Sequence, residues 1–358
     1  MGYSSMNPMM KQRAGIVSAG AACIAVLLCM AAELDAQAVP AQSPVGPLGH
    51  WKCDDAATPG KVIDASGNGF HGTCSAGATI SDAVPTTKFP NTGCLTLDGV
   101  SGIVTIPDAP VLRITGDITI AFWKRKTANN KDWTRIVGKG NGGQRNFGVW
   151  EYPEGDGRLK FQIYSTAGGS VLELDTPAAL PINAWSHVVC AISVNAAAFY
   201  VNGVLVGNAT RSGDPGVSAD PVTFGHAGYH GFWAGQLDDI RLYNRALSMS
   251  EIVYLAAGHG PPAAPTELAA ASGTTPQAAL KWTASTTVPP AGTATFYVVK
   301  RSTTPGKDYT IVASGMTGTT HVDLQAEVGK SYSYIVTAIN SGGESAPSNE
   351  ITLVPRPK

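Results

Sequence analysis

The sequence predicts an all-β protein with two sandwich-like regions. Short strand-like runs recur along the chain and are separated by turn residues. The chain contains 41 glycines and only 14% charged residues, a balance that suits short strands joined by tight turns. A Pro/Gly-rich linker over residues 258–264 divides these runs and marks the clearest domain boundary.

Residues 1–38 predict a secretory signal peptide. Lys11 and Arg13 precede an uncharged apolar stretch, and Ala36-Gln37-Ala38 forms an A-x-A cleavage pattern. The alternative is an uncleaved anchor helix, which the glycines in the apolar stretch disfavour. Residues 39–47 then form a short flexible leader. We therefore expect a secreted or cell-surface protein with no membrane insertion after signal cleavage.

The charge balance excludes some partners. Lys and Arg number 25 against 26 Asp and Glu, which gives a net charge of −1. A nearly neutral chain lacks the basic surface that nucleic acids and anionic membranes attract. We expect the partner to be a glycan or an extracellular protein.

Residues 48–257 contain the first set of strands. Asp98-Gly99 is a turn dipeptide between two short apolar runs, and Leu159–Tyr164 alternates as a half-buried strand does. Asn202-Gly203 between apolar runs predicts a hairpin. The single helical pattern begins at Ser248, which forms a capping box with Glu251. Many short strands with almost no helix predict a sandwich or jelly roll.

Several segments of this region carry a family resemblance. In chain order they are His50-Trp51-Lys52, Asp64–Gly72, Leu97–Asp108, Ala184–Val189, Tyr200–Gly203 and Gly235–Ser248. Together they resemble the laminin G-like domains of the concanavalin A-like jelly-roll class. Cys53 departs from that pattern, since the family usually has an apolar residue there.

Residues 265–355 resemble a fibronectin type III domain, a second and smaller β-sandwich. The matching segments are Pro265–Leu268, Leu280-Lys281-Trp282, Tyr297–Arg301 and Tyr332–Asn340. Tyr332 matches the tyrosine-corner position, whose hydroxyl bonds back to the backbone. We therefore interpret Trp282 and Tyr332 as structural residues.

Four cysteines remain after signal cleavage. An even number in an exported protein indicates disulfides, although four cysteines allow three connectivities. Cys74 and Cys94 flank one short loop-rich segment and form the favoured pair, which leaves Cys53 and Cys190 for the second. The alternative is that Cys53 and Cys190 are small buried apolar residues in strands.

Strand alternation predicts a calcium site. Asp238 shares a strand face with Ile240 and Leu242, so its carboxylate is drawn inward with them. Asp64 and Asn68, in a glycine-rich loop, add the oxygen ligands that Ca²⁺ prefers, and Asp239 is a less favoured participant. The resemblance implies the same, since lectin-like sandwiches often carry one structural calcium. The alternative is an Asx-turn at Asp64 and Asn68, with Asp238 bonded to side-chain donors.

Two loops are rich in aromatic residues, which commonly stack on sugar rings. The first contains Trp150 and Tyr152, and the second contains Tyr229 and His230. These four residues are the predicted ligand-binding residues. Trp233 of the second loop matches a family position that packs inward, so we assign it to the core.

The sequence disfavours catalysis. Enzymes of the concanavalin A-like class resemble one another in an E-x-D-x-x-E strand that places carboxylates on one face. The nearest segment here begins at Glu173 and Asp175 but lacks the last carboxylate, and Pro177 interrupts it. We expect a non-enzymatic binding or adhesion protein that recognises carbohydrate. The alternatives are a structural spacer that makes protein contacts and, less favoured, a glycoside hydrolase.

Overall fold

The computed structural model describes residues 46–141, 145–271, 278–285 and 296–355. The predicted signal peptide and residues 39–45 of the leader lie outside these ranges. Within them, strands dominate, as the all-β prediction requires. No helix of the described ranges is long and apolar enough to span a bilayer.

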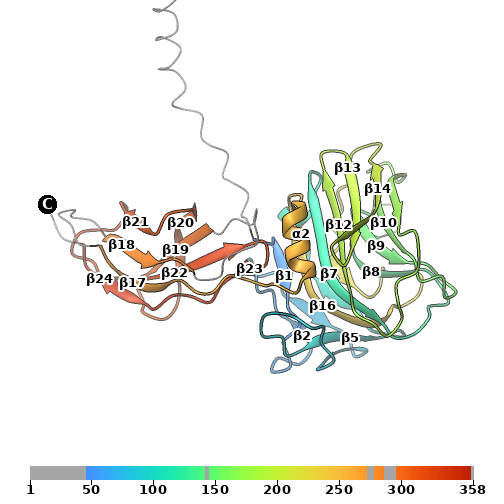
Figure 1. The fold of residues 1–358 in the computed structure, drawn as a ribbon, viewed down its shortest axis with the longest axis horizontal. Helices are drawn as coiled ribbons and strands as arrows, with labels where there is room; N and C mark the ends of the chain where they lie inside the picture. The colour runs from blue at the N-terminus through green and yellow to red at the C-terminus, as the bar shows by residue number, and fades with distance from the viewer. Residues whose placement is uncertain (1–45, 142–144, 272–277, 286–295, 356–358) are drawn as a thin grey trace, which may run out of the picture. The chain divides into compact units, whose positions relative to one another are not determined.

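The described part of the first sandwich consists of two antiparallel sheets, A and B, whose strands run from blue through green to yellow in Figure 1. Sheet A runs in the order β14 (Val204–Thr210), β13 (Ala196–Val201), β12 (Ser186–Ser193), β7 (Ile118–Lys126), β16 (Ala234–Tyr243), β5 (Cys94–Asp98) and β4 (Ala78–Ser81), with β1 (Gly49–Trp51) also paired to β16. Sheet B runs in the order β11 (Ser170–Asp175), β10 (Leu159–Tyr164), β9 (Phe147–Glu151), β8 (Thr134–Lys139), β15 (Val222–Phe224), β6 (Val104–Ile106), β3 (Gly72–Cys74) and β2 (Lys61–Val62). Apolar side chains from both sheets share one core.

Local sequence signals explain several connections. Asn202 and Gly203 adopt φ angles of 50° and 79°, the left-handed conformation that a tight hairpin between β13 and β14 requires. A short 3₁₀ helix, η1 (Pro110–Leu112), precedes β7. Helix α2 (Met249–Ala256) begins with the predicted capping box, in which the Ser248 hydroxyl accepts from the Glu251 N–H. The hairpin and helix predictions are therefore confirmed.

The turn at Asp98-Gly99 joins two sheets and is not a hairpin. Strand β5 before it belongs to sheet A, whereas β6 after it belongs to sheet B. The Asp98 carboxylate accepts the backbone N–H groups of Val100, Ser101 and Gly102 and so holds the chain as it crosses. A turn dipeptide marks a change of direction and does not specify which strand pairs next.

A β-bulge interrupts strand β16 at the point where alternation was used to predict a calcium ligand. The pairing with β7 shifts register between Asp238 and Arg241, and Asp239 has a φ of 51°. Leu237 therefore reaches the core together with Ile240, although they lie three residues apart. Asp238 is fully buried, as predicted, but the alternation from which its burial was derived does not hold there.

The second sandwich also has two sheets in its described part, drawn in orange and red in Figure 1. One contains β17 (Thr266–Ala270), β18 (Ala278–Thr283) and β21 (Thr320–Asp323), and the other contains β20 (Thr310–Met316), β19 (Phe296–Ser302), β22 (Tyr332–Asn340) and β23 (Gly343–Glu344), with β24 (Ile351–Leu353) paired to β22. Trp282, Tyr332 and Tyr334 belong to its core, which agrees with a structural role for Trp282 and Tyr332.

Candidate functional site

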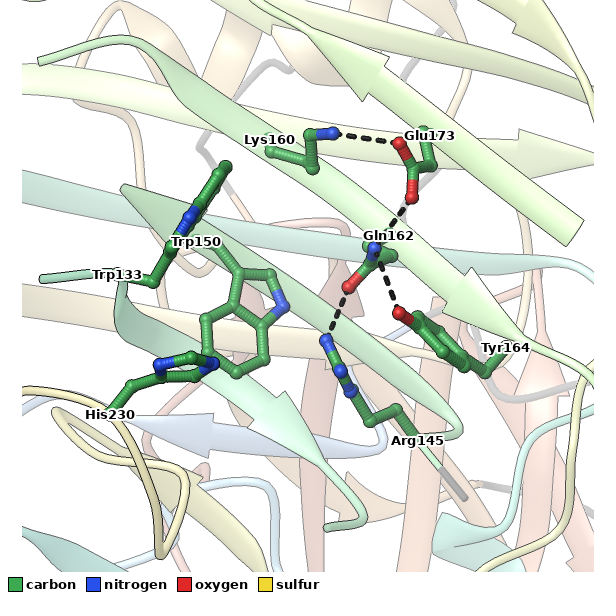
Figure 2. A pocket seen from close by; sticks show the side chains of 8 residues that line it. All are labelled: Trp133, Arg145, Trp150, Lys160, Gln162, Tyr164, Glu173 and His230. Carbon is green, nitrogen blue, oxygen red and sulfur yellow. Dashed lines mark hydrogen bonds and ion pairs between the residues drawn. The ribbon is translucent and has the colours of Figure 1, made fainter. Parts of the chain in front are cut away.

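A cavity of ≈ 280 Å³ lies on the outer face of sheet B. Alternation along β10 creates this face, because Leu159, Phe161 and Ile163 point into the core. The intervening side chains point outward and line the cavity with residues of neighbouring strands and loops. The lining residues, drawn in Figure 2, are Trp133, Arg145, Trp150, Lys160, Gln162, Tyr164, Glu173 and His230.

Arg135 and Trp150 form the floor beside this cavity. They are cross-strand partners on β8 and β9, next to a second cross-strand pair, Gly138 and Gly148. A Cβ atom on Gly148 would lie 2.6 Å from Trp150 Nε1, and one on Gly138 would lie 2.8 Å from Arg135 Cδ. The two glycines therefore make the space in which both long side chains lie along the sheet. Trp150 is only 2% exposed.

Two arginines lie against the aromatic rings of the floor. The guanidinium carbons of Arg135 and Arg145 are each 5.1 Å from the Trp150 ring centroid. Arg145 is also 4.2 Å from the Tyr164 ring and 5.4 Å from the Tyr229 ring. Such stacking orients an arginine while leaving its charge in place. Burial lowers the pKa of Arg135 to about 10, so its guanidinium remains charged at neutral pH.

The opposite side of the cavity is a hydrogen-bonded polar row. Glu173 accepts from Lys160 Nζ and from Gln162 Nε2, each at 2.8 Å, and Arg145 donates to Gln162 Oε1 at 2.7 Å. Figure 2 shows this row running from Lys160 through Glu173 and Gln162 to Arg145. The hydrogen bond from Lys160 lowers the pKa of Glu173, against a smaller effect of desolvation. Glu173 is therefore a carboxylate at neutral pH.

Aromatic side chains form the rim. The rings of Trp133 and Tyr152 lie 4.2 Å apart, and the Tyr152 hydroxyl donates to Asp175 Oδ2 at 2.7 Å. On the second loop, His230 Nδ1 lies 3.2 Å from Asp132 Oδ2. The rim thus offers partly exposed ring faces beside polar groups.

The floor and rim contain buried polar atoms that make no hydrogen bond. In the described part of the chain these include Trp150 Nε1, Arg135 Nε, the Tyr229 hydroxyl and Asp175 Oδ1. Burial raises the pKa of Tyr229, and the positive charges of Arg145 and Arg135 oppose that rise. Buried polar atoms without partners are uncommon in folded proteins and are often found at functional sites.

A buried ion cluster lies on the other face of β9, centred on Glu151. Its carboxylate, which has no exposed surface, forms ion pairs with Lys124 and Lys126. It also accepts from Asn130 Nδ2 at 3.3 Å and from Trp233 Nε1 at 2.8 Å. Every partner comes from outside β9, so Glu151 joins sheet B to β7 of sheet A and to two loops.

These two loops carry the rim residues. Asn130 lies three residues before Trp133, and Trp233 lies three residues after His230. The loops also contact each other directly, through an isolated bridge between Thr134 and Gly231 and a 3.0 Å hydrogen bond from Gly231 N to the Trp133 carbonyl. Glu151 is therefore a positioning residue for the rim.

The structure brings the four predicted ligand-binding residues to one face. Trp150 and His230 line the cavity, and the Tyr229 ring lies 6.0 Å from Trp150 and 4.7 Å from His230. Tyr152 lies on the rim. The prediction that Trp150 lies in a loop is wrong, because it lies on β9, where the glycine at position 148 lets its ring sink onto the sheet.

Sequence reasoning missed the charged part of the site. Lys160 and Gln162 could have been found from the alternation of β10, since they occupy its outward positions. Arg135 and Arg145 had no comparable signal, because their role depends on cross-strand register and on rings from distant segments.

The predicted calcium ligands do not fit a shared cation. All four acceptor positions of the Asp64 carboxylate are used by hydrogen-bond donors of the chain. These donors, at 2.8–2.9 Å, are His50 N, Ser66 N, Ser66 Oγ and Phe70 N. Asn68 directs its amide nitrogen to the Leu48 carbonyl at 2.9 Å. This arrangement is the Asx-turn that the sequence analysis gave as the alternative to a calcium site.

Asp238 belongs to a different environment from Asp64. It accepts from Asn91 Nδ2 at 2.8 Å, and burial raises its pKa to about 8. A carboxyl group that is protonated at neutral pH is a poor ligand for a hard cation. Asp239 is bonded to His50 and paired with Arg241. Among the described residues, no group of three or more His, Cys, Asp or Glu is arranged to hold a metal.

Neither predicted disulfide is present, and all four described cysteines are free. Cys190 is on β12, which β7 and β16 separate from β1, the strand just before Cys53. Three strand spacings amount to about 14 Å, twice the Cα separation of about 7 Å that a disulfide tolerates. Cys74 contacts the core, whereas Cys94 points away from it toward Ser81. Cys53 and Cys190 are instead buried as small apolar residues, which was the alternative given in the sequence analysis.

A comparison of sequences identifies a family resemblance for the first sandwich. Residues 98–253 match the family model of the concanavalin A-like lectin/glucanases superfamily. The match supports the laminin G-like part of the sequence prediction. It does not reach the second sandwich, whose fibronectin type III resemblance stays a prediction. No curated protein matches the chain.

Several solved structures are similar to parts of the chain. Domain 4 of AbnA, a GH43 extracellular arabinanase from Geobacillus stearothermophilus solved with arabinotriose, is 20% identical with a TM-score of 0.47, and the match covers 59% of this chain and 98% of that one. Trypanosoma rangeli sialidase in complex with the inhibitor DANA is 17% identical with a TM-score of 0.41, over 58% of this chain and 32% of that one. A Fn3-like protein from Clostridium thermocellum is 36% identical with a TM-score of 0.23, over 27% and 95% of the two chains.

The expectation that this protein is not an enzyme has to be corrected. The similar structures include parts of an arabinanase and a sialidase, which are enzymes. The absence of an E-x-D-x-x-E strand excludes only one arrangement of catalytic carboxylates. Likenesses of such low identity and partial coverage do not show that this chain is an enzyme either.

Proposed function

We propose that the laminin G-like sandwich binds carbohydrate on the outer face of sheet B. The observation that carries this proposal is the ≈ 280 Å³ cavity, in which aromatic rings and hydrogen-bonding side chains converge. Sugar rings present an apolar face that stacks on aromatic side chains and a ring of hydroxyl groups that needs polar partners. The cavity supplies both within one face.

The residues divide into two roles. The Trp133–Tyr152 pair at the rim gives the partly exposed ring surface on which a sugar stacks. Glu173, Gln162 and Lys160 form the polar row that exchanges hydrogen bonds with sugar hydroxyls. Because the polar row is already bonded internally, it is pre-organised before a sugar arrives.

Affinity gel electrophoresis in arabinan, xylan, pectin and cellulose derivatives tests the proposal. The full chain should be retarded by at least one of these polysaccharides. Gly148→Ala should weaken the retardation at least tenfold, because the new Cβ would lie 2.6 Å from Trp150 Nε1 and push the floor upward. Gly169→Ala is the matched control, since a Cβ there meets no atom within 4 Å.

A folded wild-type chain that no polysaccharide retards would overturn carbohydrate binding and leave the structural spacer as the better interpretation. Equal retardation of the wild-type and Gly148→Ala chains would place binding elsewhere on the molecule. Release of reducing ends in the same incubations would show hydrolysis in addition to binding.

We also infer that the protein is exported and acts outside the cytoplasm. The support is the charged, apolar and A-x-A pattern of residues 1–38 together with the laminin G-like resemblance. N-terminal sequencing of the protein from the culture medium should give Val39 as the first residue. A chain that begins at Met1 and remains with the membrane would identify the uncleaved anchor instead.

The second sandwich is, in this proposal, a fibronectin type III-like spacer beside the binding domain. The support is local. The Glu327 N–H bonds to the Tyr332 hydroxyl at 3.4 Å, as a tyrosine corner requires, and the Trp282 and Tyr297 rings meet edge to face at 5.6 Å. Deletion of residues 265–355 should leave polysaccharide binding unchanged.

A further inference from the structure

The cavity on sheet B has two chemically different ends. At one end Glu173 of β11 lines the cavity together with Lys160, and Lys160 is also paired with Asp175, two residues further along β11. Asp175 Oδ1 is buried and accepts no hydrogen bond, so this end has an unused acceptor. A sugar hydroxyl could donate a hydrogen bond to this oxygen.

The other end presents donors. Among the residues that line the cavity, Trp150 has an Nε1 that can only donate and that is buried without an acceptor. Figure 2 shows the Trp150 nitrogen on the side of the ring that faces Gln162 and Arg145.

This donor end is also cationic. Arg145 and Arg135 lie against the faces of Trp150, and Arg145 also stacks on Tyr164 and Tyr229. Stacking keeps the guanidinium groups partly out of water, where their attraction for an anion is less screened. The carboxylate that lines the cavity, Glu173, lies at the other end, on β11.

Resting on the proposed carbohydrate function, we propose that the ligand is an acidic saccharide of the uronic acid class. Its carboxylate binds at the Arg145–Trp150 end, and its hydroxyls donate to Glu173 and Asp175. A neutral sugar would leave the cationic end facing hydroxyls, which are weaker acceptors than a carboxylate. Reversal of the ligand is prevented because it would place its carboxylate against Glu173.

The experiment compares each acidic polysaccharide with its own uncharged form. Isothermal titration calorimetry of the full chain uses oligomers of galacturonate, alginate and hyaluronan, then the same oligomers after reduction of the carboxyl groups, with neutral arabinan and dextran sulfate as references. At least one uronate should bind at least tenfold more tightly than its reduced form. Its affinity should also fall as NaCl rises from 50 to 300 mM, because salt screens the ion pair.

Two variants assign the effect to the arginine end. Arg145→Gln should weaken uronate binding at least tenfold and should weaken binding of the reduced oligomer less, because the reduced oligomer has no carboxylate to pair with the guanidinium. Arg113→Gln is the control, because Arg113 is a partly exposed arginine that is paired with Asp108 and does not line the cavity. Circular dichroism melts of both variants establish that each is folded before binding is measured.

The outcomes separate this inference from the proposed function. Equal affinity for acidic and reduced oligomers would overturn the uronic acid assignment and leave carbohydrate binding intact. Dextran sulfate binding as tight as the best uronate would show general anion attraction and also overturn the assignment. Binding of no saccharide at all by the folded wild-type chain would overturn both proposals.

Discussion

Trp150 and Glu151 are neighbours on β9, yet they face environments of opposite character. Glu151 points into the sandwich, where two lysines, an asparagine and a tryptophan satisfy its carboxylate. Trp150 points out of the sheet, is nearly as buried, and has an indole N–H that bonds to nothing. Burial is therefore common to both residues, and hydrogen-bond satisfaction distinguishes them. The satisfied group holds the fold together, whereas the unsatisfied one remains available to a ligand.

The largest expected effect on stability comes from disrupting the buried ion cluster centred on Glu151. Glu151→Gln leaves Lys124 and Lys126 buried without their carboxylate, which should cost about 3–5 kcal/mol of unfolding free energy. Glu173→Gln, which removes a half-exposed carboxylate on the outer face, should cost less than about 1 kcal/mol. Urea denaturation at pH 7 measures both. Similar losses for the two variants would contradict the contrast between the faces.

Asp238 is a buried carboxyl group without the cations that surround Glu151. Its folded-state pKa is raised from 3.8 to about 8, so between these values the folded protein binds more protons than the unfolded one. Wild-type stability should therefore fall as pH rises from 4 to 8. Asp238→Asn should flatten that slope and stabilise the protein at pH 8 by about 2–3 kcal/mol, at about 1.4 kcal/mol per pKa unit with half the shift discounted.

The pH effect has a simple control. Asp308→Asn removes an exposed carboxylate and should change the stability by less than about 0.5 kcal/mol at any pH. Urea denaturation of wild type and both variants at pH 5, 6, 7 and 8 supplies the slopes. An Asp238→Asn profile parallel to the wild-type profile would show that Asp238 is ionised in the folded protein.

Two buried tryptophans sharpen the comparison further. Trp233→Phe removes the N–H that donates to Glu151 and should cost about 1–3 kcal/mol, because a buried charge loses a partner. Trp150→Phe removes an N–H without a partner and should change the stability by less than about 0.5 kcal/mol. Thermal or urea unfolding measures the stability change of each variant. Equal destabilisation would mean that the Trp150 N–H is satisfied in solution.

The smallest expected effect tests the calcium prediction. A chelator should leave the melting temperature unchanged within about 1 °C, since the chain itself supplies every donor that Asp64 accepts. Differential scanning fluorimetry with EDTA and with excess CaCl₂ measures this. A rise in Tm with calcium would restore the predicted site.

The residue pattern was sufficient for the elements and for the aromatic part of the site. The Asn202-Gly203 hairpin and the Ser248 capping box were predicted because each depends on a few adjacent residues. Trp150, Tyr152, Tyr229 and His230 were found because aromatic residues cluster in two short segments of the sequence, although Trp150 lies on β9 rather than in a loop.

The features that the sequence did not predict depend on contacts between distant segments. The bulge at Asp239 broke the alternation from which the calcium site was derived, and no glycine stands at the bulged residues to signal it in the sequence. Likewise, the position of Arg135 beside Trp150 follows from the register of β8 on β9, which no local pattern encodes. The disulfide prediction failed for the same reason, since sequence spacing shows neither which sheet a cysteine occupies nor how many strands separate two cysteines of one sheet.

The cysteines differ in burial, and this difference allows one of them to be labelled selectively. Among the described cysteines, only Cys74 is partly exposed, while Cys53, Cys94 and Cys190 are buried. Burial raises the pKa of Cys74, so alkylation should be slow at neutral pH and faster near pH 8. Of the four described cysteines, the native protein therefore offers only Cys74 on β3 to a maleimide dye, and labelling of the other three reports unfolding.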